Sequence, residues 1–185
     1  GKPEPRKEIG LIAMAHRNTY VLQGTLANTS HMIEGFIQGL KARRPALFNL
    51  YTSCQPEHGI GDDMGIVQSK LAVESRAYPL FRYNPDEGVT PAECFDLEGN
   101  PDIDSDWPRY TIKYVEDDVE KEMELPLTFA DFAITETRFR MLMKSNPERA
   151  KQLLESAGRN ASKRFEIYSH MASMAYDSAD SSADK

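Results

Sequence analysis

The stretch 46–85 constrains the fold more than any other part of the chain. An apolar run, Ala46–Tyr51, changes abruptly into polar residues, and a glycine-bearing loop, a helical stretch and a second apolar run follow. This order predicts a strand, a loop, a helix and a strand. In open α/β sheets, ligands bind beyond the carboxyl ends of the strands. The loop that begins at Thr52, Ser53 and Cys54 is therefore the first candidate site.

Similar patterns on both sides extend this order. Thr19–Thr25 is rich in β-branched and aromatic residues and predicts a preceding strand. A helix between the two strands is predicted by one apolar face, which contains Met32, Ile33, Phe36, Ile37 and Leu40. The helix after the loop is predicted by Met64, Val67 and Leu71. Tyr78–Tyr83 predicts a third strand, and two strand–helix repeats followed by a strand indicate a parallel layer.

Two glycines interrupt the first of these helices. Gly35 and Gly39 each weaken it by about 1 kcal/mol relative to alanine. Such residues are tolerated most easily where a neighbouring backbone comes close, so we expect a tight contact along this helix.

The second half of the chain has a different composition. Residues 86–108 are rich in Asp, Glu, Gly and Pro and predict a surface loop. Tyr110–Val115 and Val119–Leu125 alternate apolar with polar residues, which predicts an antiparallel hairpin. Helical spacing follows at Phe129, Phe132, Phe139 and Met143, although Glu136 interrupts the stripe, and Asn146-Pro147 is a typical start for a last helix.

The predicted fold class is α/β, with a partial parallel sheet, flanking helices, an inserted β-hairpin and C-terminal helices. We divide the chain into an α/β portion (1–92), an acidic loop and hairpin (93–126) and a helical part (127–176). The low-complexity tail, 177–185, is expected to be disordered.

Composition excludes several classes of function. The 185 residues carry 22 basic and 29 acidic side chains, a net charge of −7, which argues against nucleic acid as a partner. No apolar run approaches the roughly 20 residues of a membrane helix. The polar start, GKPEPRKE, is unlike a signal peptide and resembles a linker or a cut inside a larger protein.

The two cysteines, Cys54 and Cys94, lie far apart and belong to no CxxC or CxxH pattern. A disulfide framework is not expected, and a reducing cytoplasm is the predicted compartment. Two thiolates cannot complete a four-ligand metal site, so any cluster or zinc ion needs ligands from histidine or from elsewhere.

Cys54 allows two other interpretations. A free cysteine is most often a buried small hydrophobic residue. Cys54 and His58 could instead be a nucleophile and its base, although no third orienting residue is evident.

The glycines and acids of the same loop have simple explanations. Gly59, Gly61 and Gly65 could cradle a phosphate, but a role in turns is favoured. Asp62 and Asp63 could bind Mg²⁺ or Ca²⁺ with Glu57, but capping of the next helix explains them without an ion.

The remaining candidates have structural explanations. His16, His31 and His170 are expected to be structural or solvated. The apolar stripe Phe129–Met143 is interpreted first as part of the core. A docking face for missing domains is the second interpretation. The acidic run Glu116–Glu124 is expected to be a solvated hairpin face.

The segments LYTSC and QSKLAVESRAYPLFRYNP, joined by the glycine-bearing loop, resemble the thiamine-diphosphate domain of pyruvate:ferredoxin (flavodoxin) oxidoreductases. In that family a strand ends in Tyr-x-x-Cys, and an aromatic-Pro-Leu-aromatic-Arg-Tyr-x-Pro segment follows a helix. The resemblance extends upstream through GLIAMAHRNTYV and Ala27-Asn28. It extends downstream through Thr137-Arg138-Phe139 and FEIYSHMA.

The resemblance implies oxidative decarboxylation of a 2-oxoacid, with pyruvate the expected one, on thiamine diphosphate and Mg²⁺. Electrons would pass through [4Fe-4S] clusters to ferredoxin or flavodoxin, with coenzyme A as a co-substrate and a homodimer as one possible assembly. Cys54, rather than Cys94, matches the last ligand of the cluster nearest the thiamine, and Thr52 and Ser53 would border the thiamine diphosphate.

The chain also departs from the family. The GDG and Asn-Thr-Gly-Gly segments that hold magnesium and diphosphate are absent, as are the other cluster cysteines. The loop after Cys54 is longer and contains Pro56, and Tyr110–Leu125 has no counterpart. We therefore expect the carboxyl-terminal part of a thiamine domain, with no catalytic residue, no bound cofactor and no activity on its own. The alternative is a non-catalytic α/β binding or scaffold module that has lost the chemistry.

Overall fold

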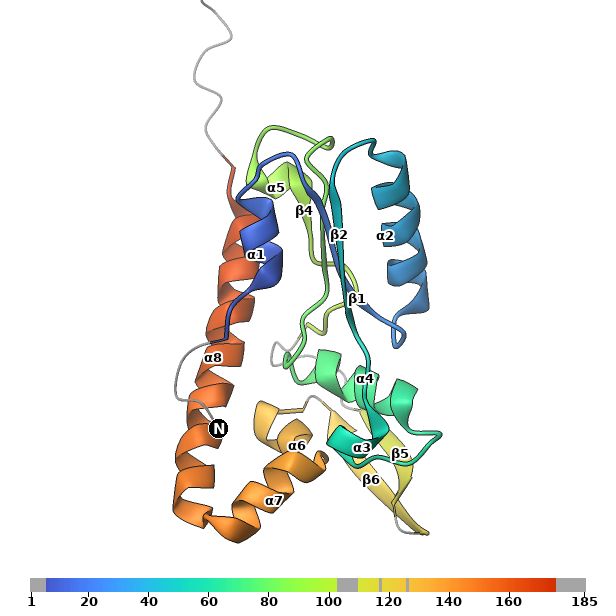
Figure 1. Ribbon diagram of the computed structural model, residues 1–185, viewed down its shortest axis with the longest axis vertical. Helices are drawn as coiled ribbons and strands as arrows, with labels where there is room; N and C mark the ends of the chain where they lie inside the picture. The colour runs from blue at the N-terminus through green and yellow to red at the C-terminus, as the bar shows by residue number, and fades with distance from the viewer. Residues whose placement is uncertain (1–5, 103–109, 117, 126, 176–185) are drawn as a thin grey trace, which may run out of the picture.

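The computed structural model describes residues 6–102, 110–116, 118–125 and 127–175. A four-stranded sheet in the order β2-β1-β3-β4 forms its centre (Figure 1). The strands are β1 (Tyr20–Thr25), β2 (Ala46–Tyr51), β3 (Phe81–Tyr83) and β4 (Phe95–Asp96). β1 and β2 are parallel, β3 is antiparallel to β1, and β4 is antiparallel to β3. The predicted α/β class is confirmed, and the sheet is partly parallel.

The third strand differs from the prediction in length and direction. β3 begins at Phe81 rather than Tyr78 and runs antiparallel to β1. The preceding helix, α4 (Gly65–Glu74), lies beyond the carboxyl end of β2 instead of crossing the sheet (Figure 1). The chain therefore re-enters the sheet at the same end at which it left β2, so β3 runs in the direction opposite to β1.

Helices cover both faces of the sheet. α2 (Thr29–Lys41) lies on one face, and α1 (Ile9–Met14) and α8 (Pro147–Ser173) lie on the other (Figure 1). A Cβ added at Gly35 would lie 2.4 Å from Leu22 Cδ1, and one at Gly39 would lie 2.8 Å from Phe48 Cε1. The predicted close approach along α2 is thus to side chains of β1 and β2 rather than to backbone.

Two clusters of buried side chains form the core. One joins the sheet to α1 and α8 and contains Met14, Val21, Phe81, Phe95 and Tyr168. The other lies where α4 meets the C-terminal helices and contains Leu71, Ala72, Tyr78, Leu127 and Phe132. Full burial of one such large apolar side chain stabilises the fold by roughly 1.5–3 kcal/mol.

The predicted surface loop after Pro85 contains regular structure. A short helix, α5 (Pro91–Cys94), leads directly into β4, which extends the sheet. Thr90 and Glu93 cap this helix reciprocally, a signal of Thr-x-x-Glu type that the acidic composition of the segment obscured. The loop prediction is therefore wrong for residues 91–96.

The hairpin and the last helix are confirmed. β5 (Tyr110–Glu116) and β6 (Val119–Leu125) pair in antiparallel register, with Tyr110 opposite Leu125. The Asn146 side chain accepts a hydrogen bond from the Arg149 N–H at the start of α8. None of the described helices is long and apolar enough to cross a membrane. The predicted disordered tail, 177–185, lies outside the described residues, as do residues 103–109.

The stripe Phe129–Met143 is not one helix. It forms α6 (Phe129–Ile134) and α7 (Thr137–Ser145), which are separated at Thr135 and Glu136. Glu136 has extended backbone angles (φ −98, ψ 128) and is fully buried. We call residues 135–137 the α6–α7 elbow. The carboxylate of Glu136 in this elbow is central to the candidate site.

Candidate functional site

The candidate loop begins with a single helical turn after β2. α3 (Gln55–His58) has Cys54 at its N-cap and Gly59 at its C-cap. The His58 N–H donates to the Cys54 carbonyl oxygen at 2.9 Å, and the Gly59 N–H donates to the Gln55 carbonyl oxygen at 2.8 Å. Cys54 itself is exposed and caps the turn through its backbone alone. The turn therefore presents the thiol at the surface.

The far end of this turn is pressed against the α6–α7 elbow. Gly59 has a left-handed backbone (φ 62), which glycine adopts without strain. A Cβ at this position would lie 1.8 Å from Thr137 Oγ1. Both the backbone conformation and the contact with the elbow therefore require glycine here. This explains Gly59 as a structural residue, in agreement with the predicted turn role.

Glu136 joins the elbow to His58. Its Oε1 lies 2.8 Å from His58 Nδ1, and its Oε2 accepts hydrogen bonds from Arg138 Nε at 2.7 Å and from the same guanidinium's terminal nitrogen at 2.6 Å. Because an ionised carboxylate can only accept, His58 Nδ1 is the donor in that state. The carboxylate thus has a partner on each oxygen.

Two further groups complete the surroundings of Glu136 Oε1. The Tyr51 hydroxyl, at the end of β2, and Gln68 Nε2, on α4, each lie 3.5 Å from it. Burial, followed by the nearby Glu136 charge, raises the pKa of Tyr51 well above its usual value. Tyr51 therefore remains a neutral hydrogen-bond donor, and the carboxylate connects β2, α3, α4 and α7.

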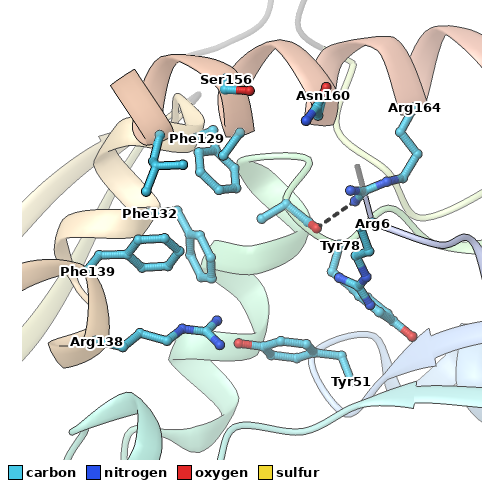
Figure 2. Close-up of a pocket in the computed structure, with 13 residues that line it drawn as sticks. Arg6, Tyr51, Tyr78, Phe129, Phe132, Arg138, Phe139, Ser156, Asn160 and Arg164 are labelled. Carbon is cyan, nitrogen blue, oxygen red and sulfur yellow. Dashed lines mark hydrogen bonds between the residues drawn. The ribbon is translucent and has the colours of Figure 1, made fainter. Parts of the chain in front are cut away.

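A pocket of about 260 Å³ opens beside this carboxylate. Aromatic rings form much of its wall, and Figure 2 shows the Arg138 guanidinium and the Tyr51 hydroxyl facing each other at one end, with Arg164 of α8 at the other. Arg138 is bound to Glu136, and Arg164 donates to Glu8 and to the Ala77 carbonyl oxygen. These two guanidinium groups fix the walls of the pocket through contacts within the chain.

The predicted thiamine-bordering residues, Thr52 and Ser53, directly precede Cys54. Thr52 is exposed, and Ser53 is half-buried with its hydroxyl 3.4 Å from the Gly65 carbonyl oxygen. Thr52 is thus accessible to a ligand, whereas Ser53 contacts the start of α4.

The predicted capping role of Asp62 and Asp63 is wrong. Both are exposed and precede α4, whose N-cap is Met64 without a side-chain hydrogen bond. Gln55 donates a hydrogen bond to the Asp62 carboxylate instead, because the turn before Met64 places Asp62 beside α3. Within the described residues, no group of three or more His, Cys, Asp and Glu side chains could hold a metal ion.

The Cys54–His58 pair has the orienting carboxylate that sequence analysis could not find, namely Glu136. In the described part of the chain, however, no hydrogen bond joins the Cys54 thiol to the His58 ring. The ring instead faces Glu136 and packs edge-on against Tyr51, at a centroid distance of 6.1 Å. This arrangement anchors the turn and does not form a nucleophile–base pair.

The second cysteine has a different environment. Cys94 is buried, and its thiol donates to the Gly88 carbonyl oxygen at 3.3 Å. Burial raises the pKa of the Cys94 thiol, and a thiol that ionises less readily is a poorer metal ligand. Cys54 is the accessible cysteine of the two.

The histidines outside the loop divide into two types. His16 and His170 are exposed. His31, in the first turn of α2, is buried, and neither ring nitrogen has a hydrogen-bond partner among the described residues. Burial, and then the nearby Arg82, lower the pKa of His31.

Sequence reasoning missed Glu136 as a site residue. Its one visible signal in the sequence is a charged residue within an otherwise apolar helical stripe, where it interrupts the pattern. A charge at an apolar position indicates a buried partner set, because an unpaired buried charge is very costly. Neither His58 nor Arg138 could be identified as that partner from sequence spacing alone.

No protein-family model matches the chain. It is 33% identical over 177 residues to the pyruvate-flavodoxin oxidoreductase of Nostoc sp., covering 94% of this chain and 12% of that protein. It is 30% identical over 173 residues to the pyruvate:ferredoxin oxidoreductase of Moorella thermoacetica, covering 93% of this chain and 13% of that protein. The pyruvate dehydrogenase [NADP(+)] of Cryptosporidium parvum is 31% identical over 174 residues, 93% of this chain and 8% of that protein. The chain thus spans about an eighth or less of these relatives.

Proposed function

Because the chain belongs to the pyruvate:ferredoxin (flavodoxin) oxidoreductase family, as the counterpart of one segment of these enzymes, we propose that it is part of a 2-oxoacid oxidoreductase. The whole enzyme would decarboxylate pyruvate oxidatively, with coenzyme A as co-substrate, and pass electrons to ferredoxin or flavodoxin. The chain alone would be inactive, because the proposed magnesium and diphosphate ligands lie in other segments. A cytoplasmic location accompanies this proposal.

The observation that carries the proposal is the position of Cys54. Its thiol is exposed at the N-cap of α3, directly after β2. A thiolate at such a position can ligate a [4Fe-4S] cluster, which requires four cysteines. Cys54 would supply one ligand, and the other three would come from the remaining domains or subunits. The role of this chain is thus to hold one sulfur atom in place at the border of the cofactor.

Thiamine diphosphate, when bound, would supply the carbanion chemistry of decarboxylation. The contribution of this chain would be to border it, through the exposed Thr52 and the neighbouring Ser53. Both follow the carboxyl end of β2, the position at which open α/β sheets bind their ligands.

The free edge of the sheet supports the inclusion of this chain in a larger domain. β2 is the last strand in the order β2-β1-β3-β4 of the described sheet. Its sequence, ALFNLY, contains no charge or proline, the residues that usually protect an exposed edge strand. Leu50 on β2 and Ile33, Ile37 and Leu40 on α2 are exposed. We propose that an upstream segment of the parent enzyme pairs with β2 and covers this apolar surface.

A full-length enzyme that contains this chain provides the test. Pyruvate-dependent reduction of ferredoxin would be compared in the native protein, in Cys54→Ser and in the matched control Cys94→Ser. We expect loss of ferredoxin reduction in Cys54→Ser with retention of pyruvate binding, and activity close to native in Cys94→Ser. Full electron transfer in Cys54→Ser would refute the ligand role, and a protein without any pyruvate-dependent turnover would favour the scaffold module.

A further inference from the structure

We propose that Glu136 is a positioning residue for the Cys54 sulfur, acting through His58. The inference rests on the proposed function of Cys54 as a cluster ligand. It assigns a role to a buried carboxylate that lies 82 positions further along the chain.

The connection between His58 and the Cys54 thiol is short. Cys54 and His58 are the two ends of one turn, and the His58 N–H donates to the Cys54 carbonyl oxygen at 2.9 Å. A single turn has almost no stability of its own, because its nucleation costs more than its few hydrogen bonds return. Its conformation must therefore be maintained by contacts at its ends.

The contacts at the end of this turn come from the α6–α7 elbow. His58 Nδ1 is bound to Glu136 Oε1 at 2.8 Å. The next residue, Gly59, approaches Thr137 so closely that no side chain fits between them. Two consecutive residues of the turn are thus held by two residues of the elbow.

The α6–α7 elbow is itself held in place by hydrogen bonds within the C-terminal helices. Glu136 Oε2 is bound by Arg138, and the backbone carbonyl oxygen of Glu136 accepts hydrogen bonds from Phe139 and Arg140 at the start of α7. α6 begins with a reciprocal cap between Thr128 and Asp131. The Glu136 carboxylate is therefore held in position by contacts other than that with His58.

The consequence concerns the thiol itself. Cys54 makes no side-chain cap hydrogen bond in the described structure, so its orientation depends on the turn rather than on contacts of its own. Ligands of a metal centre are held in orientation by neighbouring hydrogen bonds, and loss of such a partner commonly weakens metal binding. Without Glu136, the sulfur would retain its chemistry but lose its fixed placement.

The test uses the full-length enzyme with three variants. Glu136→Ala removes the anchor, and His58→Phe keeps a ring against Tyr51 but removes the Nδ1 hydrogen bond. The third combines both changes. Glu34→Gln, which changes a carboxylate on α2 bound to Arg82, is the matched control. The readouts are hydrogen exchange at the His58 and Gly59 amides and the rate at which an iron chelator removes the cluster signal in EPR.

We expect both single variants to accelerate exchange at these amides by about 10- to 100-fold, because the turn loses the buried hydrogen bond that anchors it. Cluster removal should be faster by about tenfold or more, and amides of β1 should exchange as in the native enzyme. The double variant should match the larger single effect, because the two residues act through one contact.

Native exchange and cluster removal in His58→Phe would overturn the inference, even if Glu136→Ala fails to fold. Additive effects in the double variant would also overturn it. Failure of the proposed function has a different signature: Cys54→Ser would then retain its full complement of clusters.

Discussion

Arg82 and Glu136 are both buried, charged side chains, but the groups that neutralise them differ in their access to water. The Arg82 side chain, on β3, is 7% exposed and bonds to Glu34, Asp96 and Glu98, whose side chains are 59%, 44% and 70% exposed. The Glu136 carboxylate is 0% exposed, and of its two charged or titratable partners, His58 is 11% exposed and Arg138 is 54% exposed. The partners of Arg82 are all solvated, whereas Glu136 has a solvated partner on one oxygen, Arg138, and an enclosed partner on the other, His58.

The two charged residues therefore have different structural roles. Arg82 is a sheet anchor, which joins α2 to the sheet, and Glu136 is a site anchor, which holds the turn that carries Cys54. The carboxylates around Arg82 belong to Glu34 on α2, to Asp96 on β4 and to Glu98, two residues after β4. Arg82 therefore holds α2 to the sheet. Their exposure allows each to be replaced by water. The partners of Glu136 come from four elements that converge on the Cys54 turn. Two of them, His58 and Gln68, are buried, so water cannot replace the carboxylate for them as easily. A buried ion pair that loses one member leaves an uncompensated group behind.

The largest effect is expected for Glu136→Ala. Removal of this carboxylate should destabilise the chain by about 3–5 kcal/mol, because His58 loses its acceptor in a buried place. Urea unfolding of the 185-residue chain would measure the loss. A cost below about 1 kcal/mol would mean that Glu136 contributes no more than a surface ion pair, and the contrast with Arg82 would disappear.

Arg82→Met should cost less, about 1–3 kcal/mol. The methionine retains much of the apolar stem, and the three carboxylates can turn toward water. The same unfolding experiment would compare the two variants directly. A larger loss for Arg82→Met than for Glu136→Ala would reverse the proposed order of the two anchors.

The Arg82 region should also make stability dependent on pH. Burial, and then Arg82, lower the pKa of His31 from 6.5, while Asp96, Glu98 and Glu34 raise it. Below pH 6.5 the unfolded chain therefore binds a proton that the folded chain does not, and stability falls as the pH falls toward the folded pKa. The slope reaches at most about 1.4 kcal/mol per pH unit.

Unfolding measurements between about pH 7.5 and about pH 5.5 would detect this dependence. His31→Leu should remove its contribution and give a flatter profile. An unchanged profile in that variant would exclude His31 as the source.

The smallest effect is expected for Glu34→Gln. Exposed ion pairs contribute about 0–1 kcal/mol, and Asp96 and Glu98 remain to neutralise Arg82. Thermal unfolding of this variant should be nearly native. A loss similar to that of Arg82→Met would show that a single carboxylate maintains the whole sheet anchor.

Local sequence patterns predicted the elements that depend on local physics. β2 has the predicted bounds Ala46–Tyr51, the hairpin has its predicted strands, and Asn146 caps α8. In each case a short pattern is sufficient: an apolar run, an alternation, or an Asn-Pro start. The family resemblance likewise depended on short segments, and the comparisons agree with it.

Long-range arrangement could not be predicted in the same way. The antiparallel direction of β3 follows from where α4 packs, and the break between α6 and α7 follows from the partners of Glu136. Those partners lie 78 positions upstream at His58 and 68 positions upstream at Gln68. No spacing rule connects such residues, and only the packing of the elements brings them together.

A count of iron–sulfur clusters in the full-length protein that contains this chain tests most directly whether Cys54 supplies a cluster ligand. After anaerobic reconstitution, EPR spectra of the reduced native protein would be compared with those of Cys54→Ser and Cys94→Ser. We expect Cys54→Ser to lack one [4Fe-4S] signal and Cys94→Ser to retain all of them. A full set of clusters in Cys54→Ser would contradict the proposal that this chain supplies a ligand through Cys54.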